Sequence, residues 1–276
     1  MRYILKPIRL LTAIILLLLL GPGIIILSGK VDLTTPWSEA NHDRIGIAPD
    51  PATTPEALIQ VYGARTFNWR GAFAVHTWIA VKPENAKSYT RLEVIGWRQH
   101  RGLPVISATV GWPDRNWFGS KPEIYSEIRG QEAQKLIPQI IGAAKSYPYP
   151  DKYEAWPGPN SNTFTAHVLR QVPDMKVDLP PTAIGKDYLD ESNNFMASAP
   201  SNTGVQISFY GVLGAILSKA EGIEINLLGL SFGLDPDNLA LRLPGIGKVG
   251  FISDTLAASR STLGAASGST SAPTSD

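Results

Sequence analysis

A run of apolar residues from Leu10 to Leu27 constrains this chain more than any other feature of the sequence. Its length is about what a helix needs to cross a bilayer core of roughly 30 Å. A cleaved signal peptide is the alternative, but a small-x-small cleavage site is hard to place near Ile26–Gly29, and the run is long for a signal sequence. We therefore predict an uncleaved membrane anchor.

The charges on either side of this run predict its orientation. Arg2, Lys6 and Arg9 precede it, whereas only Lys30 follows closely before the acidic Asp32. Basic residues favour the cytoplasmic side of a membrane, so we expect a cytoplasmic N-terminus and an exported remainder.

Composition excludes several classes of function. The chain of 276 residues is 43% hydrophobic and 18% charged, enough for one sizeable core. A net charge of +1 and the lack of a basic stripe argue against nucleic-acid binding. The absence of cysteine excludes disulfides, thiolate metal sites and a thiol nucleophile. No motif indicates a metal, a nucleotide or another cofactor.

The chain divides into segments of different composition. Residues 31–57 are rich in Pro, Asp and Thr and are predicted to be a linker, and residues 257–276 are predicted to be a disordered tail. The remaining divisions are the anchor (1–30), a globular domain (58–256), and within that domain a core (58–172) and a β-rich extension (173–256).

Apolar periodicity predicts an α+β fold, an antiparallel sheet with packed helices preceded by one transmembrane helix. Strands are predicted over residues 58–65, 73–81, 89–97, 105–112, 124–128, 205–217, 222–232 and 239–243. Helices are predicted over 131–147, where Pro138 is expected to mark a kink or the true start, and from Ser161 to near Val172.

The segment Gly158–Phe164 places a hydroxyl, Ser161, where the second of these helices begins. A nucleophile there faces the positive helix end, whose N–H groups can stabilise an oxyanion. His76, on a predicted strand, is the candidate general base, and Glu93 on the returning strand is the candidate to orient its imidazole. The structural alternatives are an N-cap at Ser161 and a half-buried strand histidine at position 76.

Neighbouring residues are candidates for binding a substrate. Asn160 and Asn162 flank the serine and can donate amide hydrogen bonds, although Asn is equally favoured in turns. The tryptophans that can wall a groove, or else cover a β-rich core, are Trp78, Trp112, Trp117 and Trp156.

The pentad Asn160–Phe164, Asn-Ser-Asn-Thr-Phe, resembles the Asn-Cys-Asn-Thr-Phe signature of the circularly permuted papain-like hydrolases, which include deSUMOylating isopeptidases and, more distantly, lecithin retinol acyltransferase. His76 matches the family histidine by order and context. The whole chain also resembles bacterial domain-of-unknown-function family 3750, whose members pair an N-terminal apolar segment with the Gly-Pro-Asn-Ser-Asn-Thr-Phe motif.

The resemblance implies a permuted papain-like fold, anchored in a bacterial inner membrane and facing the periplasm. Serine replaces the family cysteine, and a hydroxyl is a much poorer nucleophile than a thiolate under the same neighbours. We therefore expect a degenerate domain that binds a peptide, glycan or lipid-like ligand in the former active-site groove. The alternatives are a Ser161/His76 hydrolase or acyltransferase on amide or ester bonds, and a membrane-tethered structural scaffold.

Overall fold

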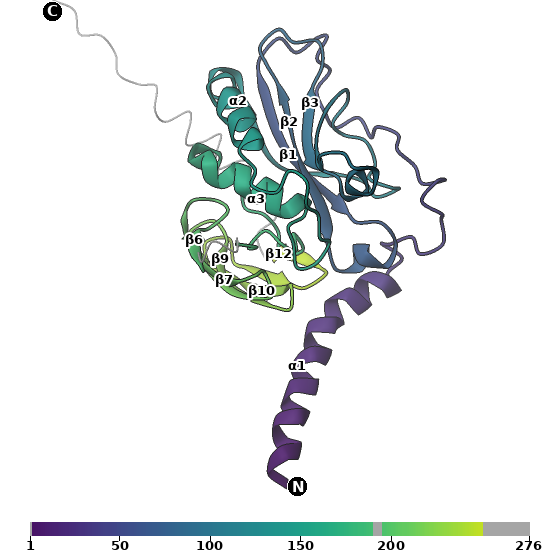
Figure 1. Ribbon diagram of the computed structural model, residues 1–276, viewed down its shortest axis with the longest axis vertical. Coiled ribbons are helices and arrows are strands. Elements are labelled where there is room, and N and C mark those ends of the chain that lie inside the picture. The colour runs from purple at the N-terminus through teal and green to yellow at the C-terminus, as the bar shows by residue number, and fades with distance from the viewer. Residues whose placement is uncertain (1, 190–194, 251–276) are drawn as a thin grey trace, which may run out of the picture.

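The apolar run forms most of helix α1 (Arg2–Leu27), which extends from the rest of the molecule (Figure 1). The computed structural model describes residues 2–189 and 195–250, so the predicted tail (257–276) and the end of the predicted extension lie outside the described residues. Within the described part, one helix is long and apolar enough to cross a membrane, over Arg9–Leu27. The rest of the described chain folds into two antiparallel sheets and two further α-helices, which confirms the α+β class.

The first sheet contains five strands in the order β4-β3-β2-β1-β5, all antiparallel. Their β-branched and aromatic residues suit a pleated surface that is covered on both sides. The strands are β1 (Leu58–Arg65), β2 (Val75–Lys82), β3 (Thr90–Val94), β4 (Ile106–Val110) and β5 (Glu123–Arg129). Short 3-10 helices, η1 (Asn68–Ala72) and η2 (Gly96–Arg101), follow β1 and β3.

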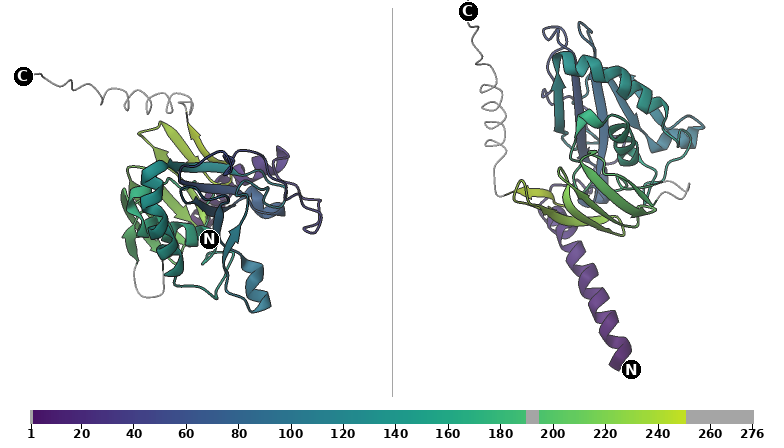
Figure 2. Two further views of the ribbon diagram at one scale, coloured as in Figure 1. Left: turned by 90° about the horizontal axis from the view of Figure 1, so that it is seen from above. Right: turned by 90° about the vertical axis from the view of Figure 1, so that its left-hand side faces the viewer.

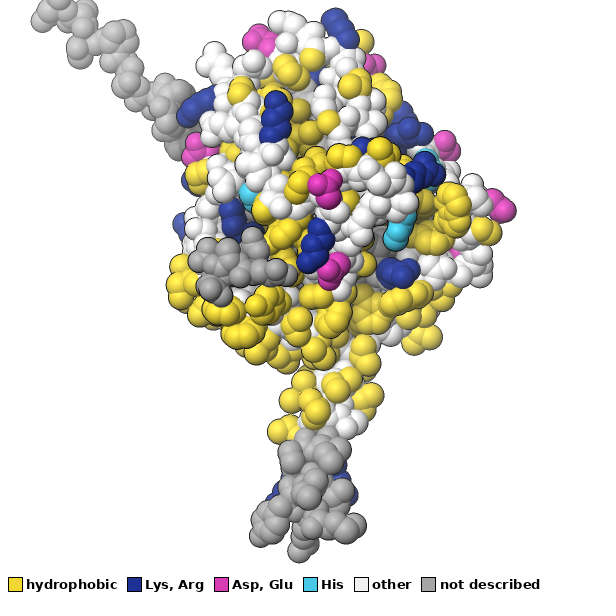
Figure 3. All heavy atoms as spheres, in the orientation of Figure 1, with side chains coloured by type: hydrophobic (Ala, Val, Ile, Leu, Met, Phe, Trp, Pro, Cys, Tyr) yellow, Lys and Arg dark blue, Asp and Glu magenta, His cyan; other side chains and the backbone are white. Residues whose placement is uncertain are grey.

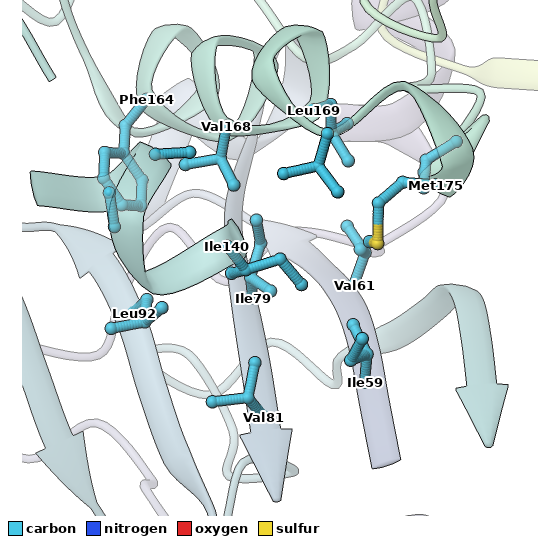
Figure 4. Packing of buried hydrophobic residues seen from close by; sticks show 14 of the residues in the cluster. Ile59, Val61, Ile79, Val81, Leu92, Ile140, Phe164, Val168, Leu169 and Met175 are labelled. Carbon is cyan, nitrogen blue, oxygen red and sulfur yellow. The ribbon is translucent and has the colours of Figure 1, made fainter. Parts of the chain in front are cut away.

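Two helices, α2 (Gly130–Lys145) and α3 (Ser161–Gln171), cover one face of this sheet. Apolar side chains from the strands and both helices meet in the main core (Figure 4). Pro138 neither starts nor ends α2. It lies inside the helix at an exposed position, where water can satisfy the carbonyl that loses its partner.

The opposite face of the first sheet carries a second core of larger side chains, including Tyr62 and Trp78. Part of the predicted linker (31–57) packs on this face of the sheet. Ala48 is buried there, the Ile45 N–H donates to the Asp114 carbonyl, and the Ala48 N–H donates to the Asp114 carboxylate. Both faces of the sheet are therefore covered.

The second sheet contains seven strands in the order of the chain, and it lies at the end of the globular part from which α1 emerges (Figure 2). Two of the predicted strands are hairpins, over residues 204–218 and 222–235. The strands are β6 (Met196–Ser198), β7 (Gly204–Phe209), β8 (Leu213–Ser218), β9 (Gly222–Leu227), β10 (Leu230–Asp235), β11 (Ala240–Leu243) and β12 (Gly247–Gly250). A 3-10 helix, η3 (Pro173–Met175), follows α3 in the connection to this sheet.

Candidate functional site

The N-cap of α3 is Asn160, one residue before the predicted Ser161. Its side-chain oxygen accepts hydrogen bonds from the N–H groups of Asn162 (2.9 Å) and Thr163 (3.2 Å). The Thr163 hydroxyl in turn accepts from the Asn160 N–H at 3.1 Å, which completes a capping box. The side-chain amide of Asn160 also donates to the carbonyl of Ile184. Asn160 therefore secures the start of the helix instead of facing a ligand.

Asn162 ties the helix to the sheet. Its amide donates to the carbonyls of Val75 (2.9 Å) and Ile184 (2.8 Å), and its oxygen lies 2.9 Å from the hydroxyl of Thr77. Thr77 also lies 2.9 Å from the Thr165 hydroxyl. The asparagines and threonines at the start of α3 thus join the helix, β2 and the loop around Ile184, and all of their polar groups are used in that structure.

The structure does not bring Ser161 and His76 together. Side chains alternate along a strand, and Thr77 points toward α3, so His76 points to the other face of the sheet. Within the described chain the Ser161 hydroxyl makes no hydrogen bond, and the predicted shared cleft between these two residues is not formed. His76 is therefore not placed to act as the general base for the Ser161 hydroxyl.

His76 and Glu93, by contrast, are in contact. The His76 Nε2 lies 2.9 Å from Glu93 Oε2, and both side chains are buried. The Arg91 guanidinium lies 2.6 Å from the second oxygen of Glu93, and the ring of Trp117 stacks on the imidazole with centroids 3.6 Å apart. Burial lowers the pKa of His76, against the opposing influence of Glu93. The His76 Nε2–H donates to the Glu93 carboxylate, and the Trp117 ring covers the imidazole.

Trp78 lies beside His76, with ring centroids 5.8 Å apart, but it is not part of an open surface. Trp78 is fully buried, stacks on Tyr62 and donates its indole N–H to the Pro113 carbonyl at 3.0 Å, so it belongs to the core and cannot line an open groove. Trp156 is half exposed, but it donates to the Leu228 carbonyl of the second sheet at 3.1 Å. It lies against the β9–β10 turn of the second sheet at Leu228 and Gly229.

A groove of about 790 Å³ opens over Trp117, on the face of the first sheet opposite the helices. Its aromatic side chains come from segments far apart in the chain, and its charged side chains are arginines. We name it the aromatic groove, and its principal lining residues are Trp37, Trp97, Trp117, Phe67, Phe118, Arg91, Arg101 and Arg115. Among the described lining residues there is no carboxylate, so the groove combines flat apolar surfaces with positive charge.

The sequence pointed to part of this groove. Trp117 was a candidate because it lies in a loop rich in Gly and Trp, but Trp37 lies in the predicted linker and Trp97 at the end of a predicted strand. The sequence signal for the rest of the groove is the spacing of Trp97 and Arg101, which both lie in η2, with the Arg101 guanidinium 4.8 Å from the Trp97 ring centroid.

A second cavity, of about 1030 Å³, lies between the two sheets near the end of α1. Its charged groups are largely occupied by structural bonds. The Arg65 guanidinium donates to the carbonyls of Gly71 and Gly245, and Lys248 is paired with Asp178 at 3.0 Å. Among the described residues, no group of three His, Asp or Glu side chains is placed to hold a metal.

Comparison with known families agrees with the motif. Residues 56–188 match the model of DUF3750, a family described as proteins of unknown function. The match supports the family assignment made from the sequence. It spans β1 through α3, including the aromatic groove's floor at Arg91 and Trp117, and ends before the second sheet. No match was found among curated proteins or among solved structures.

Proposed function

We propose that this chain is a membrane-anchored binding protein that holds an anionic glycan in the aromatic groove. One observation carries the proposal: exposed tryptophan rings and arginines line the same groove, and no described lining residue is acidic. Flat aromatic rings offer a surface on which the C–H face of a sugar ring can stack. Guanidinium groups bind carboxylates with paired hydrogen bonds.

The proposed function of the globular domain is to bind a ligand and not to catalyse a reaction. On this proposal the papain-like resemblance reflects a degenerate core, in which the start of α3 still lies against β2 but the serine and the histidine face apart. His76, Glu93 and Arg91 then hold Trp117 in place from below as a preformed wall of the groove.

The anchor in this proposal is α1, uncleaved, with the globular part in the periplasm of a bacterium. Its basic N-terminal flank supports a cytoplasmic start. Gly21, Pro22 and Ile25 are buried against the globular part, which supports retention of the helix, because removal would expose the surface they cover.

The test uses the full-length protein in lipid nanodiscs and two hexasaccharide probes, oligogalacturonate, which carries carboxylates, and neutral cellohexaose. Calorimetric titration is expected to detect the anionic probe and to give weaker binding of the neutral one. Trp97→Ala and Arg101→Gln are each expected to weaken binding at least about tenfold, or about 1.4 kcal/mol.

The chain offers a matched control. Trp69 and Arg70 form a similar exposed pair on η1, with the guanidinium 4.9 Å from the ring centroid, but neither lines the groove. Trp69→Ala and Arg70→Gln should leave affinity unchanged. Unaltered binding in the Trp97 and Arg101 variants, or no binding of the anionic probe, contradicts the proposal, and equal binding of an acidic peptide such as oligoglutamate assigns the groove to peptides.

A further inference from the structure

The second sheet has its polar face inside the protein. In a water-exposed antiparallel sheet the apolar face normally packs on the core and the polar face meets solvent. Here Glu224 and Arg242, which point inward from β9 and β11, are buried and lie 2.7 Å apart, and Lys186 lies 2.8 Å from Glu224. Gln206 accepts from Arg170 of α3 at 2.7 Å. Polar contacts therefore join this sheet to the rest of the molecule.

Its outer face is apolar from one edge to the other. The outward residues of the described strands include no charged side chain, and Ser198 is their only polar member. The large apolar side chains exposed on this face are 40–62% accessible to solvent, among them Val205, Ile207, Phe209, Leu217 and Ile225. Figure 3 shows a hydrophobic surface around the point where α1 emerges. Continuous exposed patches of this kind mark interaction surfaces.

The membrane-spanning candidate is in direct contact with this sheet. The turn between β11 and β12 packs on α1 so closely that a side chain at Gly21 would collide with the Pro244 carbonyl. A Cβ at Gly245 would lie 2.7 Å from the Pro22 nitrogen. The apolar surfaces of helix and sheet are therefore continuous, and the sheet cannot move away from the helix without breaking these contacts.

The position of that contact along the helix determines how close the sheet lies to the lipid. At 1.5 Å per residue, the stretch Arg9–Gly21 rises only about 18 Å, well short of a hydrocarbon core of roughly 30 Å. The remaining apolar turns, up to Leu27, lie beside the globular part. A globular part held wholly in water would leave too short a helix to cross the membrane.

We propose that the outer face of the second sheet is immersed in the surface of the lipid bilayer, with α1 crossing the membrane beside it. The sheet is open, and unpaired edge groups are not tolerated in hydrocarbon, so the sheet lies along the interface instead of crossing it. Its outward leucine, isoleucine, valine and phenylalanine side chains enter the acyl region, and its polar inner face remains in the protein.

Because the chain contains no cysteine, a thiol-reactive spin label attaches only to a cysteine introduced by substitution. Full-length variants Leu217→Cys and Ile225→Cys, on the outer face of β8 and β9, are spin-labelled and reconstituted in phosphatidylethanolamine/phosphatidylglycerol nanodiscs. Val110→Cys on β4 is the control, because it is also an exposed strand residue (68%) but belongs to the first sheet. The readout is the collision rate of each label with oxygen, which partitions into lipid, relative to a water-soluble nickel chelate.

The ratio of oxygen to nickel collisions should rise at positions 217 and 225 and remain low at position 110. Low ratios at all three positions would overturn the proposal, since α1 alone would then hold the protein to the membrane. Labels at 217 and 225 that are shielded from both reagents and coupled to one another between molecules would also overturn it, by assigning the face to a second copy. Thermal unfolding of each labelled variant establishes that the fold is retained.

Discussion

At the scale of single residues, Asn160 accounts for more of the motif than Ser161 does. Its oxygen caps two N–H groups, and its amide donates to the carbonyls of Ala155 and Ile184. Gly185 leaves room for this side chain, since a Cβ there would lie 2.5 Å from the Asn160 amide nitrogen, and its φ of +90° also favours glycine. The motif is therefore explained by the geometry of a buried helix start.

A pair of substitutions separates this structural role from a chemical one. Asn160→Ala should lower the free energy of unfolding by about 2 to 3 kcal/mol, because it removes a cap and leaves buried carbonyls without donors. Ser161→Ala should change it by less than about 1 kcal/mol, since the hydroxyl makes no hydrogen bond in the described chain. Urea unfolding in detergent measures both. A larger loss for Ser161→Ala than for Asn160→Ala would refute this assignment.

The orientation of His76 illustrates a limit of reading residues from sequence. The predicted hairpin brings Glu93 close to His76, and the structure places these two side chains in contact. The face was not predictable, because every residue of β2 is buried and alternation then gives no indication of which side α3 covers. Ser161 and His76 are in the expected order along the chain but on opposite sides of the sheet.

At the scale of secondary structure, the strands of the first sheet and both globular helices were predictable from apolar runs, with β1 found at its predicted bounds. The hairpin turns of the second sheet were not. Leu228 and Gly229 form a two-residue turn with φ of 57° and 82°, yet leucine gives none of the usual Asn or Asp signal for such a turn. The alternation of apolar and polar residues shows that the two faces of the sheet differ, but it does not show which face is buried. That the apolar face points outward could therefore be seen only in the structure.

The buried charges of the second sheet give a prediction for that element. Arg242 is buried between Glu224 and Asp178, and although burial lowers its pKa, the two carboxylates more than offset this, so it stays protonated. Arg242→Met should lower the free energy of unfolding by about 3 to 5 kcal/mol, because Glu224 is left buried with less compensation.

The control is an exposed ion-paired residue of the same type. Arg129 contacts Glu56 and Glu127 at the surface, and Arg129→Met should cost less than about 1 kcal/mol. Urea unfolding of the two variants under one set of conditions checks the difference. Equal losses would mean that the inward charges of this sheet are not structurally important.

At the scale of the whole molecule, the predicted topology places the two ends of α1 on opposite sides of a membrane. In spheroplasts that express full-length variants, a membrane-impermeant maleimide should label Val110→Cys directly. It should label Tyr3→Cys only after lysis, because the basic flank predicts a cytoplasmic location for that end. Gel-shift of the labelled protein provides the readout, and the reverse pattern would invert the orientation.

The close fit between α1 and the turn at Pro244 has a mechanical consequence. A domain on a flexible stalk samples many heights and tilts, but here the Gly21 and Gly245 contacts leave no hinge between the anchor and the second sheet. If α1 spans a membrane as proposed, the aromatic groove is held at a fixed height and orientation above the lipid. On the proposed function, this fixed height limits binding to glycans that extend to the level of the groove.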